Sequence, residues 1–325
     1  WRLTTFDTMI MGSMDFKTWY RIGKQPGFPE GECPSFFILP RTTPGAGTAP
    51  AGAKLPTHVH KASHGGKDWM QVGTYTAGPP KTNGNWTALL PEVKIDAGNC
   101  YASKDFYDPV KGRRINWGWA TVPPASTQTL PREVTWHPEL QQLVYSPVEE
   151  QDSLRGAVLG KLQKKVLLNE AVSMNLPEKA GRQSEIELSF ERPSVAVRLS
   201  VHVMVGAQNG SEFFIDYKPN NNTEILKVQV GSGGTTDTLS LLPSDKTIDL
   251  KLYVDNTFTE AFWMGGRVAM TIVTKSSGGK DDVSIGASAS GVIFSATAWE
   301  VGSIWVTPEV VKQTPRRDTP EAIII

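Results

Sequence analysis

The sequence lacks several features that mark common classes of protein. Two cysteines in 325 residues are too few for a disulfide framework. Positive and negative side chains balance at 33 each, so no net charge attracts nucleic acid or an anionic membrane surface. The longest apolar runs fall well short of the roughly 18 residues that a transmembrane helix needs. These absences argue against a disulfide scaffold, a nucleic-acid partner and a membrane span.

The first residues also lack the signs of a natural start. The chain opens on Trp1 without an initiator methionine, and the opening stretch WRLTTFDTMIMGS has no charged region followed by an apolar core, so it is not a signal peptide. It already has the character of a strand. We expect the numbered chain to begin inside a longer polypeptide.

Short strands and tight turns are what the composition favours. The chain has 23 prolines, 30 glycines and 10 tryptophans, with few runs of strong helix formers. In the first half, short apolar strands alternate with loops, and 41–56 is a Pro/Gly/Ala loop. From about 164 the strands lengthen and alternate cleanly between apolar and polar residues, as in SEIELSF over 184–190. This pattern predicts an all-β protein in which a propeller, sandwich or barrel precedes a β-sandwich.

The change of pattern near residue 150 predicts two domains. The stretch VEEQDSLRGAVLGKL over 148–162 has an acidic start and a basic end, which suits a helix dipole. It is the best helical candidate in the chain. The expected organisation is a partial propeller over 1–150, a linker with a short helix over 151–164, the sandwich over 165–310 and a tail over 311–325.

Three glycosylation sequons occur, at Asn85, Asn209 and Asn221. Chance yields one or two such triplets in a chain of this length, so the third tilts towards a secretory route. We expect an extracytoplasmic location, whether secreted, in the cell wall or in a vacuole or lumen.

Seven stretches, in one order along the chain, resemble the glycoside hydrolase family 32 of invertases, fructanases and fructosyltransferases. They are 12-GSMDFKTW-19, 32-ECP-34, 101-YASKDFYD-108, 113-RRINWGW-119, 129-TLPRE-133, 147-PVEEQDSLR-155 and 253-YVDNTFTEAFWMGGR-267. The resemblance implies a five-bladed β-propeller followed by a β-sandwich. It also implies sucrose or a fructan as the sugar, and neither a cofactor nor a metal.

The resemblance assigns the general acid/base to Glu32, in the Glu-Cys step. Retaining glycoside hydrolysis needs a second carboxylate about 5–5.5 Å away as the nucleophile. In the family this is an Asp in a Trp-Met-Asn-Asp-Pro-Asn-Gly strand, and another Asp, in an Arg-Asp-Pro motif, holds the sugar hydroxyls. Neither motif occurs here. The resemblance therefore implies an incomplete propeller, and an N-terminal segment or another protein is expected to cover its open edge.

The acid must be protonated to work, so partial burial by Cys33, Pro34 and Phe36 is expected to raise its pKa. An exposed loop carboxylate is the structural alternative for Glu32. The resemblance places Tyr101, Ser103 and Lys104 on the strand that supports the acid and binds substrate. An ordinary core strand is the structural alternative for these residues.

Other candidate residues have equally plain structural alternatives. Trp117 and Trp119 share one face of a strand and are candidates to wall a sugar pocket or to pack between blades. Lys67 and Asp68 are candidates to choose the substrate. His58, His60 and His64 look like a metal cluster but lack supporting ligands, so we expect surface residues. Asp255 and Glu260, in the sandwich signature, are expected to be structural.

Three functions remain open from the sequence. The chain is part of a β-fructofuranosidase whose nucleophile another segment supplies, an inactive relative kept as a scaffold or subunit, or a sugar-binding module of a larger assembly. Glu32 alone cleaves nothing by the retaining route, because the covalent intermediate forms on the second carboxylate.

Overall fold

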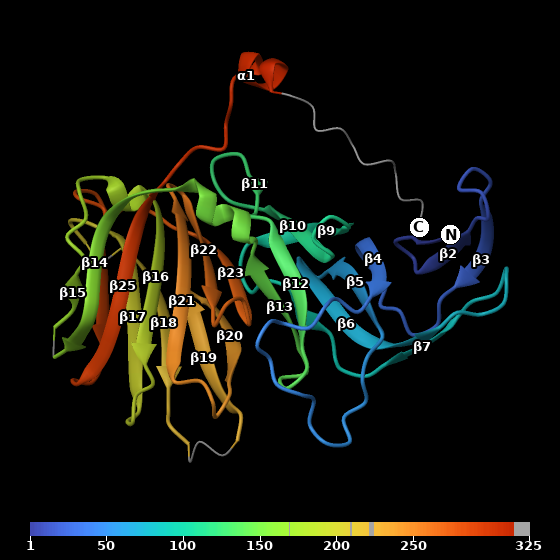
Figure 1. The fold of residues 1–325 in the computed structure, drawn as a ribbon, viewed down its shortest axis with the longest axis horizontal. Helices are drawn as coiled ribbons and strands as arrows, with labels where there is room; N and C mark the ends of the chain where they lie inside the picture. The colour runs from blue at the N-terminus through green and yellow to red at the C-terminus, as the bar shows by residue number, and fades with distance from the viewer. Residues whose placement is uncertain (169, 209, 221–223, 315–325) are drawn as a thin grey trace.

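The computed structural model describes residues 1–168, 170–208, 210–220 and 224–314. Figure 1 shows two lobes built almost wholly of strands, with the N-terminal half on one side and the C-terminal half on the other. One buried apolar cluster fills the C-terminal lobe, and a second extends from the N-terminal lobe to Tyr253, Phe262 and Ala269 of the C-terminal lobe. The predicted all-β architecture is confirmed.

Three antiparallel sheets make up the N-terminal lobe. Within each sheet, strands that follow one another along the chain lie largely side by side, which is how propeller blades are built. The first sheet contains β1 (Arg2–Thr4), β2 (Met9–Gly12) and β3 (Tyr20–Lys24). The second contains β4 (Glu32–Ile38), β5 (His58–His64), β6 (Lys67–Thr76), β7 (Asn85–Ala88) and β8 (Val93–Lys94). The third contains β9 (Cys100–Asp108), β10 (Arg113–Ala120), β11 (Thr127–Gln128), β12 (Arg132–His137) and β13 (Gln142–Pro147).

The segment that leaves the third sheet differs from its prediction. A short 3-10 helix, η1 (Glu149–Leu154), is followed directly by the long strand β14 (Arg155–Leu167). β14 pairs with β25 (Val292–Val301) along most of its length. The predicted helical linker is therefore wrong from Arg155 onward, because the ladder to β25 satisfies the backbone groups that a helix would have satisfied internally.

The C-terminal lobe is a sandwich of two six-stranded antiparallel sheets. One sheet has the order β14-β25-β16-β21-β22-β23 and the other the order β15-β24-β17-β18-β19-β20. The strands not yet placed are β15 (Val172–Ser173), β16 (Gln183–Glu191), β17 (Val197–Val205), β18 (Ser211–Tyr217), β19 (Leu226–Ser232), β20 (Thr235–Leu241), β21 (Thr247–Asp255), β22 (Phe258–Trp263), β23 (Val268–Val273) and β24 (Asp282–Ala287), with a 3-10 turn, η2 (Ala180–Arg182), before β16.

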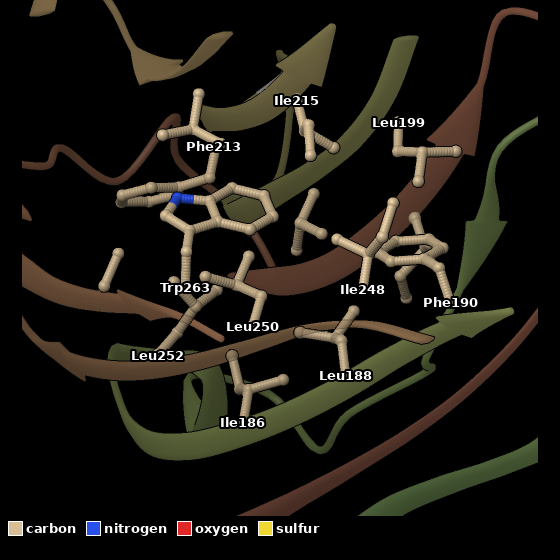
Figure 2. Packing of buried hydrophobic residues seen from close by; sticks show 14 of the residues in the cluster. Ile186, Leu188, Phe190, Leu199, Phe213, Ile215, Ile248, Leu250, Leu252 and Trp263 are labelled. Atoms are coloured by element: carbon tan, nitrogen blue, oxygen red, sulfur yellow. The ribbon is translucent and has the colours of Figure 1, made fainter. Parts of the chain in front are cut away.

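The sandwich core follows from the alternation in the sequence. Every second residue of β16 and β21 points inward, so Ile186, Leu188, Ile248 and Leu250 meet the facing sheet. Figure 2 shows these side chains interleaved with Phe213, Ile215 and Trp263 between the two layers. This packing fixes the register of the sandwich.

A buried ionic cluster joins the two lobes. Arg132, on β12, places Nη1 2.8 Å from Oδ2 of Asp96 and Nη2 2.6 Å from Oε2 of Glu260 on β22. All three side chains are at most 2% exposed. The backbone N–H of Leu130 also donates to Glu260. Glu260 is therefore structural as predicted, and it ties the sandwich to the third blade.

The chain leaves the sandwich through an exposed segment that ends in α1 (Pro308–Gln313), at the top of Figure 1. Most of the predicted tail over 311–325 lies outside the described residues. Within the described ranges, no helix has both the length and the apolar character that crossing a bilayer requires.

Candidate active site

Glu32 is the first residue of β4, and its side chain is exposed. The phenol Oη of Tyr101 donates a hydrogen bond to Oε2 of Glu32 across 2.7 Å. The sequence predicted a partly buried carboxyl surrounded by Cys33, Pro34 and Phe36. That prediction is wrong for the described chain, in which those residues extend along β4 and leave the carboxylate at its open end.

A β-bulge directly after Glu32 sets the direction of its side chain. Glu32 pairs with Ser63 and Ser35 pairs with Lys61, so β4 has one residue more than β5 between these two pairs. Cys33 takes up the extra length in a left-handed conformation, with φ of 48°. Bulges turn the strand and re-aim neighbouring side chains, and they are over-represented next to functional sites.

Tyr101 stands beside a second bulge of the same kind. Tyr101 pairs with Trp119, whereas Lys104 pairs with Trp117, so β9 has one residue more than β10 between these two pairs. Ala102 has a φ of 51° within this stretch. The hydrogen bond between Glu32 and Tyr101 thus joins two bulged strands that belong to different sheets.

A buried lysine lies between these two bulges. Lys61 Nζ donates to the carbonyl oxygen of Cys33 at 3.2 Å and to the carbonyl oxygen of Ser103 at 2.6 Å. It also donates to Ser63 Oγ at 2.8 Å and lies 3.2 Å from Oδ2 of Asp68. Burial lowers the pKa of Lys61, and the charge of Asp68 offsets part of that effect.

Asp68 completes the cluster from β6. Its Oδ2 accepts a hydrogen bond from the backbone N–H of Ser103 at 2.6 Å, and its side chain is 1% exposed. Lys67 points instead to the carbonyl oxygens of Ala97 and Gly98. Both side chains are therefore bound within the protein, which does not favour the interpretation that they choose the substrate.

The other residues predicted on β9 divide into two groups. Lys104 is exposed, and its Nζ donates to the carbonyl oxygen of Pro34 at 2.7 Å. Ser103 is fully buried and contributes backbone groups to the Lys61 and Asp68 contacts. A direct contact between Ser103 and a substrate is therefore not supported.

Gly31 allows the chain to approach β5 closely just before the carboxylate. A Cβ atom at this position would lie 2.7 Å from the carbonyl oxygen of Ser63 and 2.9 Å from the Cβ of Ala62. Its backbone N–H donates to the carbonyl oxygen of Phe6, in the turn between β1 and β2. A larger residue at position 31 would clash with β5, which explains the glycine before Glu32.

The two tryptophans lie on the face of β10 that carries Tyr101 and Lys104 across the β9 ladder. Trp117 stacks on Phe106 with ring centroids 5.3 Å apart, and Trp119 is 49% exposed. Both line an open hollow of about 670 Å³ together with Lys104 and residues 125–128. The surface-pocket interpretation of these tryptophans thus has a cavity to support it.

Lys104 also borders a second hollow, of about 340 Å³, between the first two sheets. Trp1, Phe16, Trp19, Pro34 and Phe36 are among the residues that line it. Pro34, next to the bulge at Cys33, therefore borders a hollow whose aromatic residues come from the first two sheets and the segments around them.

The histidines do not form a metal site within the described residues. His60 is 1% exposed and stacks on Phe28 with ring centroids 4.0 Å apart, so its prediction as a surface residue is wrong. His58 and His64 are partly exposed and stack on Phe36 and Trp69.

Of the three sequons, one has its asparagine among the described residues. Asn85 is exposed at the start of β7, and its glycosylation stays a prediction. Asn209 and Asn221 lie outside the described residues.

Sequence reasoning missed Lys61 as part of the site, and it considered Asp68 only as a residue that chooses the substrate. The lysine sits in HVHKASH over 58–64, where five consecutive residues are buried. A charged residue within such a strand is a signal of a buried ion pair.

Three blade-like sheets, a sandwich and a carboxylate at the start of a propeller strand define a two-domain protein of the propeller-and-sandwich class. Residues 5–147 match the family model described as "Glycosyl hydrolases family 32 N-terminal domain", and residues 150–300 match "Glycosyl hydrolases family 32 C terminal". The chain therefore belongs to glycosyl hydrolases family 32, which confirms the family indicated by the sequence motifs.

Similar curated proteins are plant enzymes. The chain is 32% identical over 209 residues to "Beta-fructofuranosidase, insoluble isoenzyme 1" of Daucus carota, a match covering 57% of this chain and 34% of the relative. It is 30% identical over 214 residues to "Fructan 1-exohydrolase w3" of Triticum aestivum, covering 58% and 34%. The matched region thus spans about a third of the length of these relatives.

Similar solved structures support the fold. Fructan 1-exohydrolase IIa from Cichorium intybus superposes with a TM-score of 0.75 at 20% identity, covering 91% of this chain and 66% of that one. A variant of that enzyme in complex with 1-kestose gives a TM-score of 0.74 at 20% identity, covering 91% and 67%.

Proposed function

We propose that this chain carries the general acid/base of a β-fructofuranosidase-type retaining glycosidase, and that Glu32 is that residue. The observation that supports it best is the contact between the bulged strands β4 and β9, in which the carboxylate of Glu32 accepts a hydrogen bond from the phenol of Tyr101. The similar curated proteins are a β-fructofuranosidase and fructan exohydrolases. The proposed substrates are sucrose and fructan-type sugars with a terminal fructosyl unit.

In this reaction, the protonated Glu32 carboxyl gives its proton to the glycosidic oxygen as the bond to the fructosyl carbon breaks. A second carboxylate forms a covalent fructosyl ester. Glu32 then takes a proton from water, or from another sugar hydroxyl, whose oxygen displaces that ester. We propose that a segment outside residues 1–325, in the same polypeptide or in a partner, supplies the second carboxylate.

Tyr101 keeps Glu32 in place for both steps. Its phenol occupies one carboxylate oxygen and leaves Oε1 for the proton that is transferred. The hydrogen bond to Glu32 raises the pKa of Tyr101 to about 12, so the phenol stays a donor throughout the neutral range. Trp117, Trp119 and Lys104 are proposed to line the sugar site, since they border the hollow next to Tyr101.

The first sheet supports the proposal that another segment covers this lobe. Its strand β1 pairs only with β2 among the described strands. Trp1, Leu3 and Phe6 around this edge are between 47% and 59% exposed. An unpaired apolar edge is a place where a further strand or chain adds. We also propose an extracytoplasmic location, with Asn85 as a glycosylation site.

The test is fructose release from sucrose and 1-kestose by the native polypeptide that contains these residues. Glu32→Gln should lower kcat/KM by about 10²–10⁴, the usual contribution of general acid–base catalysis. Glu30→Gln is the matched control, because Glu30 is an exposed carboxylate two residues earlier that pairs with Lys24.

Two results would overturn the proposal. One is a Glu32→Gln variant with activity close to that of the unmodified protein. The other is a native polypeptide that binds these sugars without releasing fructose, which would favour the non-catalytic sugar-binding function instead.

A further inference from the structure

We propose that Lys61 is a positioning residue that fixes Glu32 against Tyr101 by holding the two bulges at a set distance from each other. The inference rests on the proposed function only in the role that it gives Glu32. The geometry itself concerns the buried contacts between three strands.

Among the described strands, no ladder connects the two bulges. β4 belongs to the second sheet and β9 to the third, and the two sheets share no backbone pairing among the described strands. The relative position of Glu32 and Tyr101 therefore depends on side chains that cross from one sheet to the other. Lys61 crosses at the bulges themselves, because it binds the carbonyl oxygens of Cys33 and Ser103.

Each of these carbonyl groups lies close to a site residue along the chain. Cys33 directly follows Glu32, and Ser103 stands two residues after Tyr101. Cys33 and Ala102 have positive φ values of 48° and 51°. Residues other than glycine adopt this backbone conformation only when the surrounding structure stabilises it. The ammonium group of Lys61, which is bonded to both bulges, stabilises these two backbone conformations.

The ammonium of Lys61 and the carboxylate of Asp68 form a buried ion pair. Lys61 is 0% exposed and Asp68 is 1% exposed, so each charge depends on the other. The ammonium has three donor hydrogens, and its oxygen neighbours are two carbonyl groups, one hydroxyl and one carboxylate. Asp68 in turn fixes the backbone N–H of Ser103. An apolar side chain at position 61 would fill the space but lose the bonds of the ammonium to both bulges, leaving Lys104 Nζ on the carbonyl oxygen of Pro34 as the remaining lysine contact between the two strands among the described residues.

The test reads the contact between Tyr101 and Glu32 directly, without any sugar. The 13Cζ signal of Tyr101, assigned by its loss in Tyr101→Phe, is followed from pH 8 to pH 11.5 in the folded chain. In the unmodified protein the pKa of Tyr101 is about 12 because of the hydrogen bond to Glu32. Lys61→Met should lower this pKa towards the ordinary value of about 10.

Two further variants separate positioning from general stability. Lys67→Met is the matched control, because Lys67 also caps backbone carbonyl groups but at Ala97 and Gly98. It should leave the titration of Tyr101 unchanged even where it lowers the Tm. Lys61→Met/Asp68→Asn removes both buried charges, so it avoids an unpaired carboxylate if the single variant does not fold.

Support for the proposal is a lowered Tyr101 pKa in Lys61→Met, or in Lys61→Met/Asp68→Asn when it is compared with Asp68→Asn, together with an unchanged value in Lys67→Met. The comparison with Asp68→Asn is needed because the charge of Asp68 also raises the pKa of Tyr101. A Tyr101 pKa that stays near 12 in a folded Lys61 variant, or that falls equally in Lys67→Met, overturns it. Because this readout needs no hydrolysis, it is independent of the assay of Glu32→Gln. Failure of the positioning role and failure of the proposed function are therefore distinguishable.

Discussion

Tyr101 and Glu32 lie on strands of two different sheets and are joined by one hydrogen bond of 2.7 Å between phenol and carboxylate. Each stands beside a residue with a positive φ in a β-bulge, and the buried Lys61 bonds to both bulges. The position of the proposed acid is therefore set by the interface between two sheets and not by β4 alone.

This contact predicts the ionisation of Tyr101. The carboxylate accepts a hydrogen bond from the phenol and would repel a phenolate, so the pKa of Tyr101 is raised to about 12. Glu32→Gln removes the negative charge and should lower that pKa by about 1–2 units. The 13Cζ titration by NMR measures it, and a pKa that is unchanged in the variant would show that the contact does not exist in solution.

Removal of the arginine from the ionic cluster between the lobes should cause a large loss of stability. Arg132→Met leaves Asp96 and Glu260 buried without their cation, and breaking a buried pair in this way costs about 3–5 kcal/mol. Urea unfolding measures the change. Arg41→Met is the control, because Arg41 pairs with Glu133 while its own side chain is 46% exposed; its loss should cost less than about 1 kcal/mol.

His60 predicts that stability falls in mild acid. Burial lowers the pKa of His60 to about 3, and neither ring nitrogen has a hydrogen-bond partner in the described part of the chain. The unfolded chain therefore binds a proton below about pH 6.5 that the folded chain does not, which stabilises the unfolded state as pH falls. From pH 7 to pH 5 this one group should lower the free energy of unfolding by about 2 kcal/mol.

His60→Leu should remove that part of the pH dependence, as measured by urea unfolding at the two pH values. The control is Met70→Leu on the adjacent strand β6, a fully buried residue whose replacement should change stability equally at both pH values. An equal loss between pH 7 and pH 5 in His60→Leu and in the unmodified chain would contradict the account.

Much of the fold was predictable because burial repeats with the period of a strand. In SEIELSF over 184–190, Ile186 and Leu188 alternate with polar residues, and both lie in the sandwich core. Helical features of 148–162 were misleading, because pairing of β14 with β25 is a long-range contact that local charges do not report.

The site was predictable only in part. The Glu-Cys step pointed to Glu32 through its resemblance to a family motif, but the two bulges carry no local signal. Positive φ values at Cys33 and Ala102 arise from contacts with other strands and sheets, not from residues that prefer them. The pair of Lys61 and Asp68 likewise appears only when β5, β6 and β9 are brought together.

The most direct test of the central claim, that Glu32 is the acid/base of a fructosidase, is azide rescue of Glu32→Ala in the native polypeptide. The account predicts that this variant loses far more activity on sucrose than on an aryl β-fructofuranoside, whose leaving group needs little protonation. Added azide should accelerate turnover of the aryl substrate and yield a fructosyl azide of retained configuration. Equal losses on both substrates with no effect of azide, or activity close to that of the unmodified protein, would contradict it.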